Sequence, residues 1–456
     1  MRAVWIACAL TLGPTAAAVA QTPLTFGDAL AVAQRANDQL RAAAAHLDGA
    51  RESQAAERGL RFPTVTALGG YMHMNDRLFV DLDALKPVLS ALNPSVPIPH
   101  LEATVLENDP YRVGVTAHWT VYAGGRIDAA NRAAHAGVTG AEQLQRTTED
   151  GVMTELVDRY FKRRLAADAL EVRRQALETF TRHLEDSRRL KAAGQIARKD
   201  ELRAEVARAE AEREWKKAQR DVDLASVALN ATLGNTVEAD PTTPLALIVG
   251  LPPRESFAQS AEAANPVVGR IAALRDQAHE GARALHGERR PSVSLLGGYD
   301  FFDRGLNTTA DPKWMVGIAA RWELFDGGTR AHRARAAEHV EAAAGFETER
   351  VRHDVNTLVR QRYDEYESAL EQYQSLETTI ALSEESLRAE RDAYAAGVGT
   401  SLDVVDAELA LSRARVDRLT AIYQLDVALA RLLEASGRSA EFVEYLSHAT
   451  PVEELR

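Results

Sequence analysis

The chain has 456 residues and a formal net charge of −12. This acidic balance argues against nucleic acid as a partner, because binding to nucleic acid requires a basic face. Charged residues make up 26% of the chain and aromatic residues only 6%, a composition typical of a helix-rich protein with much exposed surface.

Residues 1–20 have the pattern of a signal peptide. A positive charge at Arg2 precedes an apolar stretch, and a small-residue cleavage motif ends at Ala20. The alternative is a buried N-terminal helix. Cys8 is the only cysteine of the sequence and lies in this segment, so the mature chain is expected to have no disulfide and no cysteine-ligated metal.

The sequence repeats one plan twice. A strand-like run that closes on an aromatic residue and a Gly-Gly pair occurs at 119–125 and again at 322–328, an offset of 203 that persists for over a hundred residues. Before these runs the offset is 228, so the first half is 25 residues longer. A long internal repeat predicts two copies of one structural unit. The expected divisions are a first repeat at 21–237, a proline-rich linker at 238–255, a second repeat at 256–437 and a C-terminal tail at 438–456.

Four segments alternate between apolar and polar residues with a period of two. They predict strands at about 63–75, 111–123, 291–303 and 313–326. Their length of about ten to twelve residues is that of a tilted membrane strand, although a half-buried soluble sheet shows the same alternation. The extra residues of the first half, around 78–109, are predicted to form a loop between two strands. The polar face of the strands would carry Thr116, His118, Thr120, Arg321 and Glu323.

A long proline-free helical pattern follows each Gly-Gly pair. Helices of about 65 residues would be on the order of 100 Å long, and such helices are stabilised by packing sideways in a coiled coil. After a short glycine break each chain turns back, which predicts two antiparallel hairpins with tips at about 190–203 and 393–406. The glycines that permit the sharp change from strand to helix are Gly124, Gly125, Gly327 and Gly328.

Four strands are too few to close a membrane barrel. Lipid excludes open strand edges, and the smallest membrane barrels have eight strands, so several chains would have to pool their strands. The alternative is a soluble periplasmic coiled-coil scaffold or adaptor protein whose strands form a small capping sheet. A secreted enzyme is not indicated, since no HExxH, P-loop or Rossmann pattern is present, and no cofactor or metal is predicted.

The chain resembles the TolC family of outer-membrane efflux proteins. The aromatic-x-Gly-Gly motifs at 122–125 and 325–328 are similar to that family's strand-to-helix junctions. The run from Tyr394 through Gly397 and Asp403 to Asp406 resembles its hairpin tip, and Gly194-x5-Asp200 is a degenerate first copy.

The resemblance implies a mostly α fold with a membrane β part. Three chains would each give four strands to one twelve-stranded barrel, and their coiled-coil hairpins would form a periplasmic tunnel. It further implies a passive export duct in the outer membrane of a Gram-negative bacterium, in contact with its lipid. The duct would carry small molecules (drugs, metals, metabolites) or a polypeptide from a periplasmic adaptor served by an inner-membrane pump of the RND or ABC type.

The resemblance also gives roles to residues at the tips. Asp403 and Asp406 are spaced i, i+3, so they lie on one helical face, and in a trimer they would form carboxylate rings that attract cations. The alternative is that Asp403 only caps its helix. Asp200 and Tyr394 join this expected gate. The expected adaptor-docking residues are Gly194, Gln195, Ile196, Gly397, Val398 and Gly399.

Overall fold

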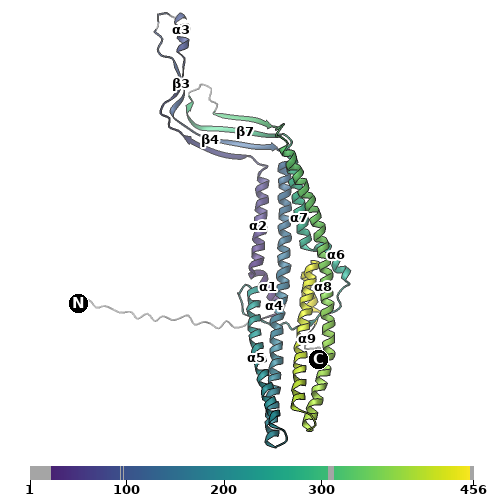
Figure 1. Ribbon diagram of the computed structural model, residues 1–456. Helices are drawn as coiled ribbons and strands as arrows, with labels where there is room; N and C mark the ends of the chain where they lie inside the picture. Colours follow the sequence, from purple (N-terminus) through teal and green to yellow (C-terminus); the bar gives the residue numbers. More distant parts are fainter. Residues whose placement is uncertain (1–21, 93, 96, 307–312, 452–456) are drawn as a thin grey trace, which may run out of the picture. The chain divides into compact units, whose positions relative to one another are not determined.

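The computed structural model of the protein (Figure 1) describes residues 22–92, 94–95, 97–306 and 313–451. The expected signal peptide at 1–20 lies outside the described residues. The chain divides into two compact units. We call helical unit the described residues within Met1–Ala45, Gln143–Val268 and Val351–Arg456, and sheet unit the described residues within His46–Glu142 and Gly269–Arg350.

The fold is mostly helical, and eight of the described helices form four pairs of matching length. Helices α1 and α6 have 11 residues each, α2 and α7 have 22 each, α4 and α8 have 67 each, and α5 and α9 have 35 and 36. The elements in chain order are β1 (Thr22–Leu24), α1 (Phe26–Ala36), α2 (Asp38–Gly59), β2 (Thr64–Tyr71), β3 (Leu78–Asp81), η1 (Asp83–Leu85), α3 (Lys86–Leu92), β4 (Glu102–Tyr122), α4 (Arg126–Ala192), α5 (Arg198–Thr232), β5 (Ala239–Pro241), β6 (Ala246–Leu247), α6 (Arg254–Ala264), α7 (Pro266–Gly287), β7 (Ser292–Leu306), β8 (Trp314–Arg321), α8 (Thr329–Ala395), α9 (Ser401–Ser436), η2 (Ser439–Glu441), α10 (Phe442–Ser447) and β9 (Thr450–Pro451).

A cluster of aromatic rings forms the centre of the helical unit. Phe26 stacks on Phe161 with ring centroids 5.6 Å apart, and Tyr160 meets Phe26 edge-on at 5.4 Å. Phe442 closes the cluster from the C-terminal segment. Each of these side chains is almost fully buried, and burial of a side chain of this size contributes roughly 1.5–3 kcal/mol. The Tyr160 hydroxyl donates to the main-chain oxygen of Leu24 at 2.7 Å, which fixes β1 beside this core.

The sheet unit contains one antiparallel sheet with the strand order β2-β4-β7-β8, and β3 pairs with the first part of β4 (Figure 1). The register opposes Thr116 to Thr66 and Gly298, His118 to Thr64 and Leu296, and Arg321 to Ser292. Residues that oppose one another share a face of the sheet. Thr116, His118, Thr120 and Arg321 therefore lie on one face.

The opposite face of the sheet is apolar and open to solvent in the single chain. Its most exposed members include Val316 and Ile318, both at 76%, and Val65 at 67%. Among the described residues, β2 and β8 pair on one side only, so each leaves an open strand edge. Unpaired strand edges are sites at which another chain can pair.

The expected ends of two strands are wrong. The first strand was expected to reach about residue 75 but ends at Tyr71. The fourth strand was expected to reach residue 326 but ends at Arg321, and Glu323 lies in the irregular segment that follows. The main-chain oxygen of Glu323 there accepts a hydrogen bond from Arg330 at 2.5 Å, which holds this segment to the start of α8. Glu323 is therefore not part of the polar strand face.

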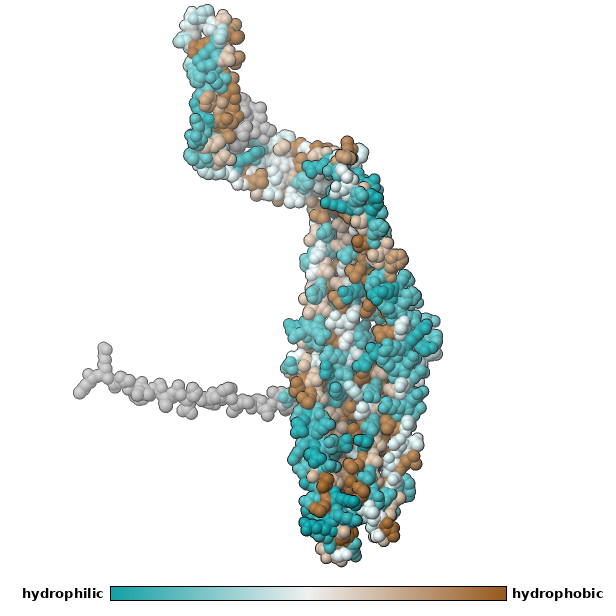
Figure 2. Space-filling model, in the orientation of Figure 1, coloured by the Kyte–Doolittle hydropathy of each residue, from teal (hydrophilic) through white to brown (hydrophobic). Residues whose placement is uncertain are grey.

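The 25-residue insertion is also more ordered than the expected loop. It holds β3, η1, α3 and the first residues of β4, which begins at Glu102. Its prolines indicated a break, but Pro110 lies inside β4, between two residues where the register against β7 shifts. Strand irregularities of this kind are where a proline is tolerated. Figure 2 shows brown, apolar residues on the surface of β3 and α3, and Leu78, Phe79, Val88 and Leu92 are exposed there.

Across the described ranges, no helix has both the length and the apolar composition needed to cross a membrane.

Candidate functional site at the hairpin tips

The first hairpin tip, between α4 and α5, is closed by a glycine in the left-handed region. Gly194 has φ +72°, and its N–H donates to the Lys191 oxygen at 2.9 Å. The N–H of Gln195 donates to the Leu190 oxygen at 2.9 Å. These bonds satisfy the last carbonyl groups of α4, as a helix C-terminus requires. Gln195 is exposed and Ile196 half-buried, so both lie at the surface of the helical unit.

The second tip, between α8 and α9, has the same construction. Gly397 has φ +76°, and the N–H of Val398 donates to the Ala393 oxygen at 3.0 Å. Val398 is 83% exposed at the end of the turn. A Cβ at Gly399 would lie 2.9 Å from the main-chain nitrogen of Tyr394. Position 399 therefore has no room for a side chain.

Asp403 caps the start of α9. The Thr400 hydroxyl accepts from the Asp403 N–H at 3.3 Å, and the Asp403 carboxylate accepts from the Thr400 N–H at 3.0 Å. This reciprocal arrangement satisfies two N–H groups of the first turn. The Thr400 hydroxyl and N–H, with the charge of Arg203, hold the pKa of Asp403 below its ordinary value. Asp403 therefore has the helix-capping role that was one of the two alternatives given for it from the sequence.

Arg203 of α5 places a positive charge near one aspartate of each tip. Its guanidinium lies 3.7 Å from the Asp200 carboxylate and close enough to Asp403 to lower the pKa of that group. The sequence analysis missed Arg203. A signal was available, because at the offset of 203 Arg203 is the repeat partner of Asp406: the second half has an acid where the first has a base.

Asp406 lies one helical turn beyond Asp403 and is exposed. It lines a groove of about 350 Å³ between α5 and α9, whose other walls include Leu202, Val206 and Leu409. Leu202 is 48% and Val206 58% exposed, so the groove offers apolar surface beside a carboxylate.

Tyr394 packs against α4. Its hydroxyl lies 3.4 Å from the Ser187 hydroxyl, and its ring centroid lies 5.4 Å from that of His183. His183 in turn places Nε2 2.8 Å from the Ser401 hydroxyl at the start of α9. We call these four residues the tip cluster. The sequence analysis missed His183 and Ser187, since nothing in the helical pattern distinguishes them from residues on a solvated face.

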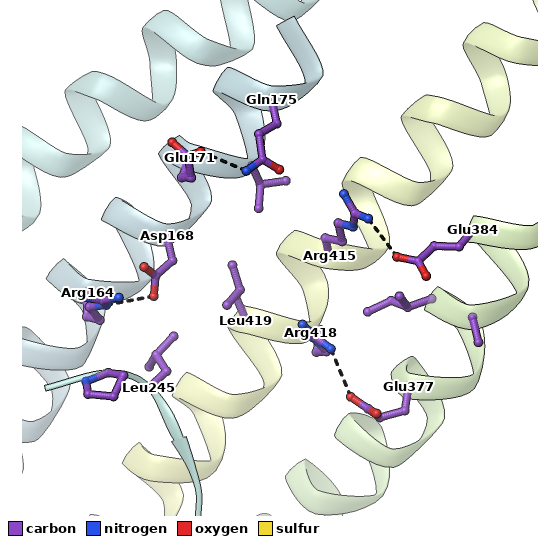
Figure 3. A pocket seen from close by; sticks show the side chains of 14 residues that line it. Arg164, Asp168, Glu171, Gln175, Leu245, Glu377, Glu384, Arg415, Arg418 and Leu419 are labelled. Atoms are coloured by element: carbon purple, nitrogen blue, oxygen red, sulfur yellow. Dashed lines mark hydrogen bonds and ion pairs between the residues drawn. The ribbon is translucent and has the colours of Figure 1, made fainter. Parts of the chain in front are cut away.

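A layer of ion pairs lies behind the tip cluster. Arg391 of α8 binds Glu408 of α9 at 2.8 Å. Glu408 is buried, and burial raises the pKa of its carboxyl in spite of the nearby Arg391. Further along the hairpins is a cavity of about 890 Å³ between α4, α8, α9 and the linker (Figure 3). Across its α8–α9 wall, Arg415 pairs with Glu384 at 2.8 Å and Arg418 with Glu377 at 3.4 Å, so charged contacts hold the second hairpin together.

The junction glycines all have positive φ. The values are +67° for Gly124, +91° for Gly125, +67° for Gly327 and +86° for Gly328, a region that residues with a Cβ rarely adopt. Gly124 is also crowded, because a Cβ there would lie 2.3 Å from the Gly287 oxygen. At the first junction three residues separate the end of β4 from the start of α4, whereas seven residues separate the end of β8 from the start of α8 at the second.

Tryptophans mark both junctions in the same way. The indole N–H of Trp119 donates to the main-chain oxygen of Arg61 at 2.9 Å, and that of Trp322 donates to Arg289 at 3.2 Å. Each bond ties the chain just before the glycine pair to the turn that follows α2 or α7. The spacing of 228 between the two acceptors and of 203 between the two donors is that of the sequence repeat.

The protein belongs to the outer membrane efflux protein family. The model of that family matches residues 29–235 and 257–438, which include both hairpins, both tips and both junctions.

Individual relatives agree with this assignment. The alkaline protease secretion protein AprF of Pseudomonas aeruginosa is 24% identical over 306 residues, which are 65% of this chain and 63% of that protein. The chain thus matches less than two thirds of the length of this curated relative. The fold of the present chain is similar to that of the MtrE outer membrane channel of Neisseria gonorrhoeae. The TM-score is 0.73 at 21% identity, and the match covers 91% of this chain and 89% of MtrE. VceC of Vibrio cholerae, an outer membrane protein, gives a TM-score of 0.71 with 18% identity and coverage of 90% and 96%.

Proposed function

We propose that the protein is the outer-membrane duct of a tripartite export system. One observation carries the proposal: the sheet has an apolar face, a polar face and two open edges, in a chain of the outer membrane efflux protein family. Lipid can contact the apolar face, but the open edges have to be paired before the sheet can enter a bilayer. Pairing with further copies of the chain would close the open edges and leave the apolar face outside, in contact with lipid.

The assembly proposed is a homotrimer with one twelve-stranded barrel, to which each chain gives β2, β4, β7 and β8. The polar face with Thr116, His118, Thr120 and Arg321 would line the lumen. The matched lengths of the paired helices, together with the repeated tryptophan contacts, support an origin of the two halves in one duplicated unit. Residues 1–20 would be removed on export to the periplasm.

The helical units of the three chains would form the periplasmic part of the duct, and their tips its entrance. Gly194, Gln195, Ile196, Gly397, Val398 and Gly399 lie at the two turns, where an adaptor protein would dock. Exposed Val398 and the apolar groove beside Asp406 support docking of a helical partner there. Asp200, Asp403, Asp406 and Tyr394 would surround the entrance.

The duct itself would be passive, with energy supplied by an inner-membrane pump of the RND or ABC type. AprF is described as a protease secretion protein and MtrE as an outer membrane channel. Both a polypeptide and small molecules such as drugs, metals or metabolites are therefore candidate cargo. Copurification of this chain with its adaptor, followed by identification of the inner-membrane pump that binds the same adaptor, would distinguish polypeptide cargo from small-molecule cargo.

A fractionation experiment tests the proposal. The full chain is expressed with its N-terminal segment in a Gram-negative host, and the envelope is separated into periplasm, inner membrane and outer membrane. We expect the protein in the outer membrane as a trimer that resists unheated SDS and separates into monomers on boiling. A monomer released with the soluble periplasm would instead support the coiled-coil scaffold and refute the duct.

A further inference from the structure

The tip cluster joins α4 to the second hairpin through polar contacts around one titratable side chain. His183 bonds Ser401 at 2.8 Å, and Tyr394 reaches from α8 to Ser187. Ser401 is 1% exposed and Ser187 fully buried, so water has little access to replace these partners. A change of charge on His183 therefore acts directly on the contact between the two hairpins.

The surroundings of His183 disfavour its protonated form. Burial lowers the pKa of His183; the negative charge of Asp186 on α4 opposes this, and the positive charge of Arg391 adds a smaller lowering. Asp186 is itself paired with Arg189. Ser401 lies in the first turn of α9, where the helix dipole presents positive charge to the imidazole.

Several other charged groups at this end of the hairpins are engaged elsewhere. On α8 and α9, Arg391 pairs with Glu408, and Asp403 is held by Thr400. On α5, Glu201 pairs with Lys191 of α4, and Asp200 faces Arg203. On α4, Arg182 contributes positive charge towards Glu408. Apart from Asp186, the cluster thus offers protonated His183 mainly positive neighbours.

We propose that His183 is a proton-sensitive latch, which holds the second tip against α4 while neutral and releases it when protonated. The latch rests on the proposed function only for its consequence, the opening of the duct entrance. The contact itself belongs to the single chain. An imidazolium would face the N-terminus of α9 and Arg391, with only the already paired Asp186 to compensate, so the closed arrangement loses stability as the pH falls.

The sign and size of the effect follow from linkage. A histidine whose pKa is lowered in the closed arrangement leaves that arrangement fully stable above the ordinary value for histidine. The stability then declines as the pH falls from that value to the lowered pKa, below which the loss is complete. One proton per latch changes the ratio of closed to open tips by up to about tenfold for each pH unit across that range. The entrance should therefore be shut at neutral pH and open progressively in acid.

Distance measurements on the full chain test the latch. Spin labels are placed at Ala192→Cys and Ala396→Cys, which are both exposed, and the expected absence of other cysteines from the mature chain keeps labelling specific. We expect the distance distribution of the detergent-solubilised protein to lengthen or broaden between pH 8 and pH 5. His183→Gln, which can still bond Ser401 but does not titrate, should keep the pH 8 distribution at pH 5. His183→Arg should give the acid distribution at pH 8.

Two controls make the outcome decisive. His353→Gln, at an exposed histidine of α8, should behave like the parent protein, and circular dichroism should show that each variant keeps its helices. The latch is refuted if the parent distance does not change with pH, or if His183→Gln shifts as the parent does. If the protein is an outer-membrane trimer but its tip distance does not change with pH, the duct proposal stands and the latch is refuted. If the distance changes with pH but the protein fails the fractionation test, the latch stands and the duct proposal is refuted.

Discussion

The side-chain amide of Asn265 donates a hydrogen bond to the main-chain oxygen of Ala435 at 2.8 Å, and Asn37 makes the same bond to Thr232 at 3.0 Å. Each asparagine stands at the break between two short helices, and its side-chain oxygen caps the second of them, at 2.8 Å from the Val267 N–H in the one case and 2.9 Å from the Gln39 N–H in the other. In each half, one buried asparagine thus caps the second helix of the bend and ties the bend to the end of α5 or α9.

Loss of this carboxamide should be costly. In Asn265→Ala the Ala435 oxygen loses its donor and the start of α7 loses its cap, so we expect the free energy of unfolding of the helical unit to fall by roughly 1–3 kcal/mol. The thermal midpoint of the helical circular dichroism signal measures the change. Gln374→Ala, on an exposed position of α8, is the matched control and should leave the midpoint unchanged. Equal midpoints for the two variants would contradict the proposed role.

The buried carboxyl of Asp426 should make the protein less stable as the pH rises. Asp426 is fully buried in α9, and neither of its oxygens has a hydrogen-bond partner among the described residues. Burial raises its pKa well above the ordinary value. The folded protein therefore keeps a proton that the unfolded chain releases, and stability declines as the pH rises above the ordinary aspartate value.

Two variants separate the titration of Asp426 from its polarity. Asp426→Asn should flatten the decline in melting temperature between pH 5 and pH 8. Asp426→Leu should also raise stability by roughly 1–3 kcal/mol, because an unsatisfied buried polar group is removed. Asp223→Asn, at the exposed repeat position in α5, is the control and should follow the parent. A parent protein with no decline over this range would disprove the assignment.

Gly124 should be required for assembly, whereas Gly69 should not. Alanine at 124 would combine a φ of +67° with a Cβ 2.3 Å from the Gly287 oxygen. Gly69 lies in β2, and a Cβ at that position would have no other atom within 4 Å among the described residues. We expect Gly124→Ala to reduce the SDS-resistant trimer in the outer membrane severalfold and Gly69→Ala to leave it near the parent level. Similar trimer yields from both variants would show that the junction tolerates a side chain.

The tip aspartates can be tested as a pore ring. If Asp403 and Asp406 surround the entrance, the double variant Asp403→Ala, Asp406→Ala should weaken block of single-channel conductance by multivalent cations in planar bilayers, because rings of carboxylates attract cations. Asp392→Ala, at an exposed position on α8 close to the same tip, is the control. Unchanged block in the double variant would leave Asp403 as a helix cap and Asp406 as a groove residue.

The patterns that depend on local periodicity predicted the structure well. The strand alternation placed Thr116, His118, Thr120 and Arg321 on one face, as the register of the sheet has them. The glycine breaks located both hairpin turns, because a positive φ leaves a mark in the sequence. The prediction for Glu323 was wrong because the alternation in the sequence continues for several residues beyond the end of β8 at Arg321.

Contacts between distant helices were not predictable from the sequence. His183 and Ser401 are 218 residues apart, and neither breaks the pattern of its own helix. The order within the insertion was likewise missed, because its prolines suggested a loop while the pairing of β3 with β4 depends on residues more than twenty positions away. Tertiary partners decide such cases, and a single sequence does not contain them.

The parallel pairing of β1 with β5 has a consequence for biogenesis. Thr22 is in register with Ala239, so β1 has to wait for a partner that lies more than two hundred residues further along the chain. The ring of Phe442, which closes the cluster around Phe26 and Phe161, lies further along the chain still, so apolar residues of the first half stay accessible to holdase chaperones until it arrives. Export rate, rather than the intrinsic speed of helix formation, would set the pace at which this subunit matures.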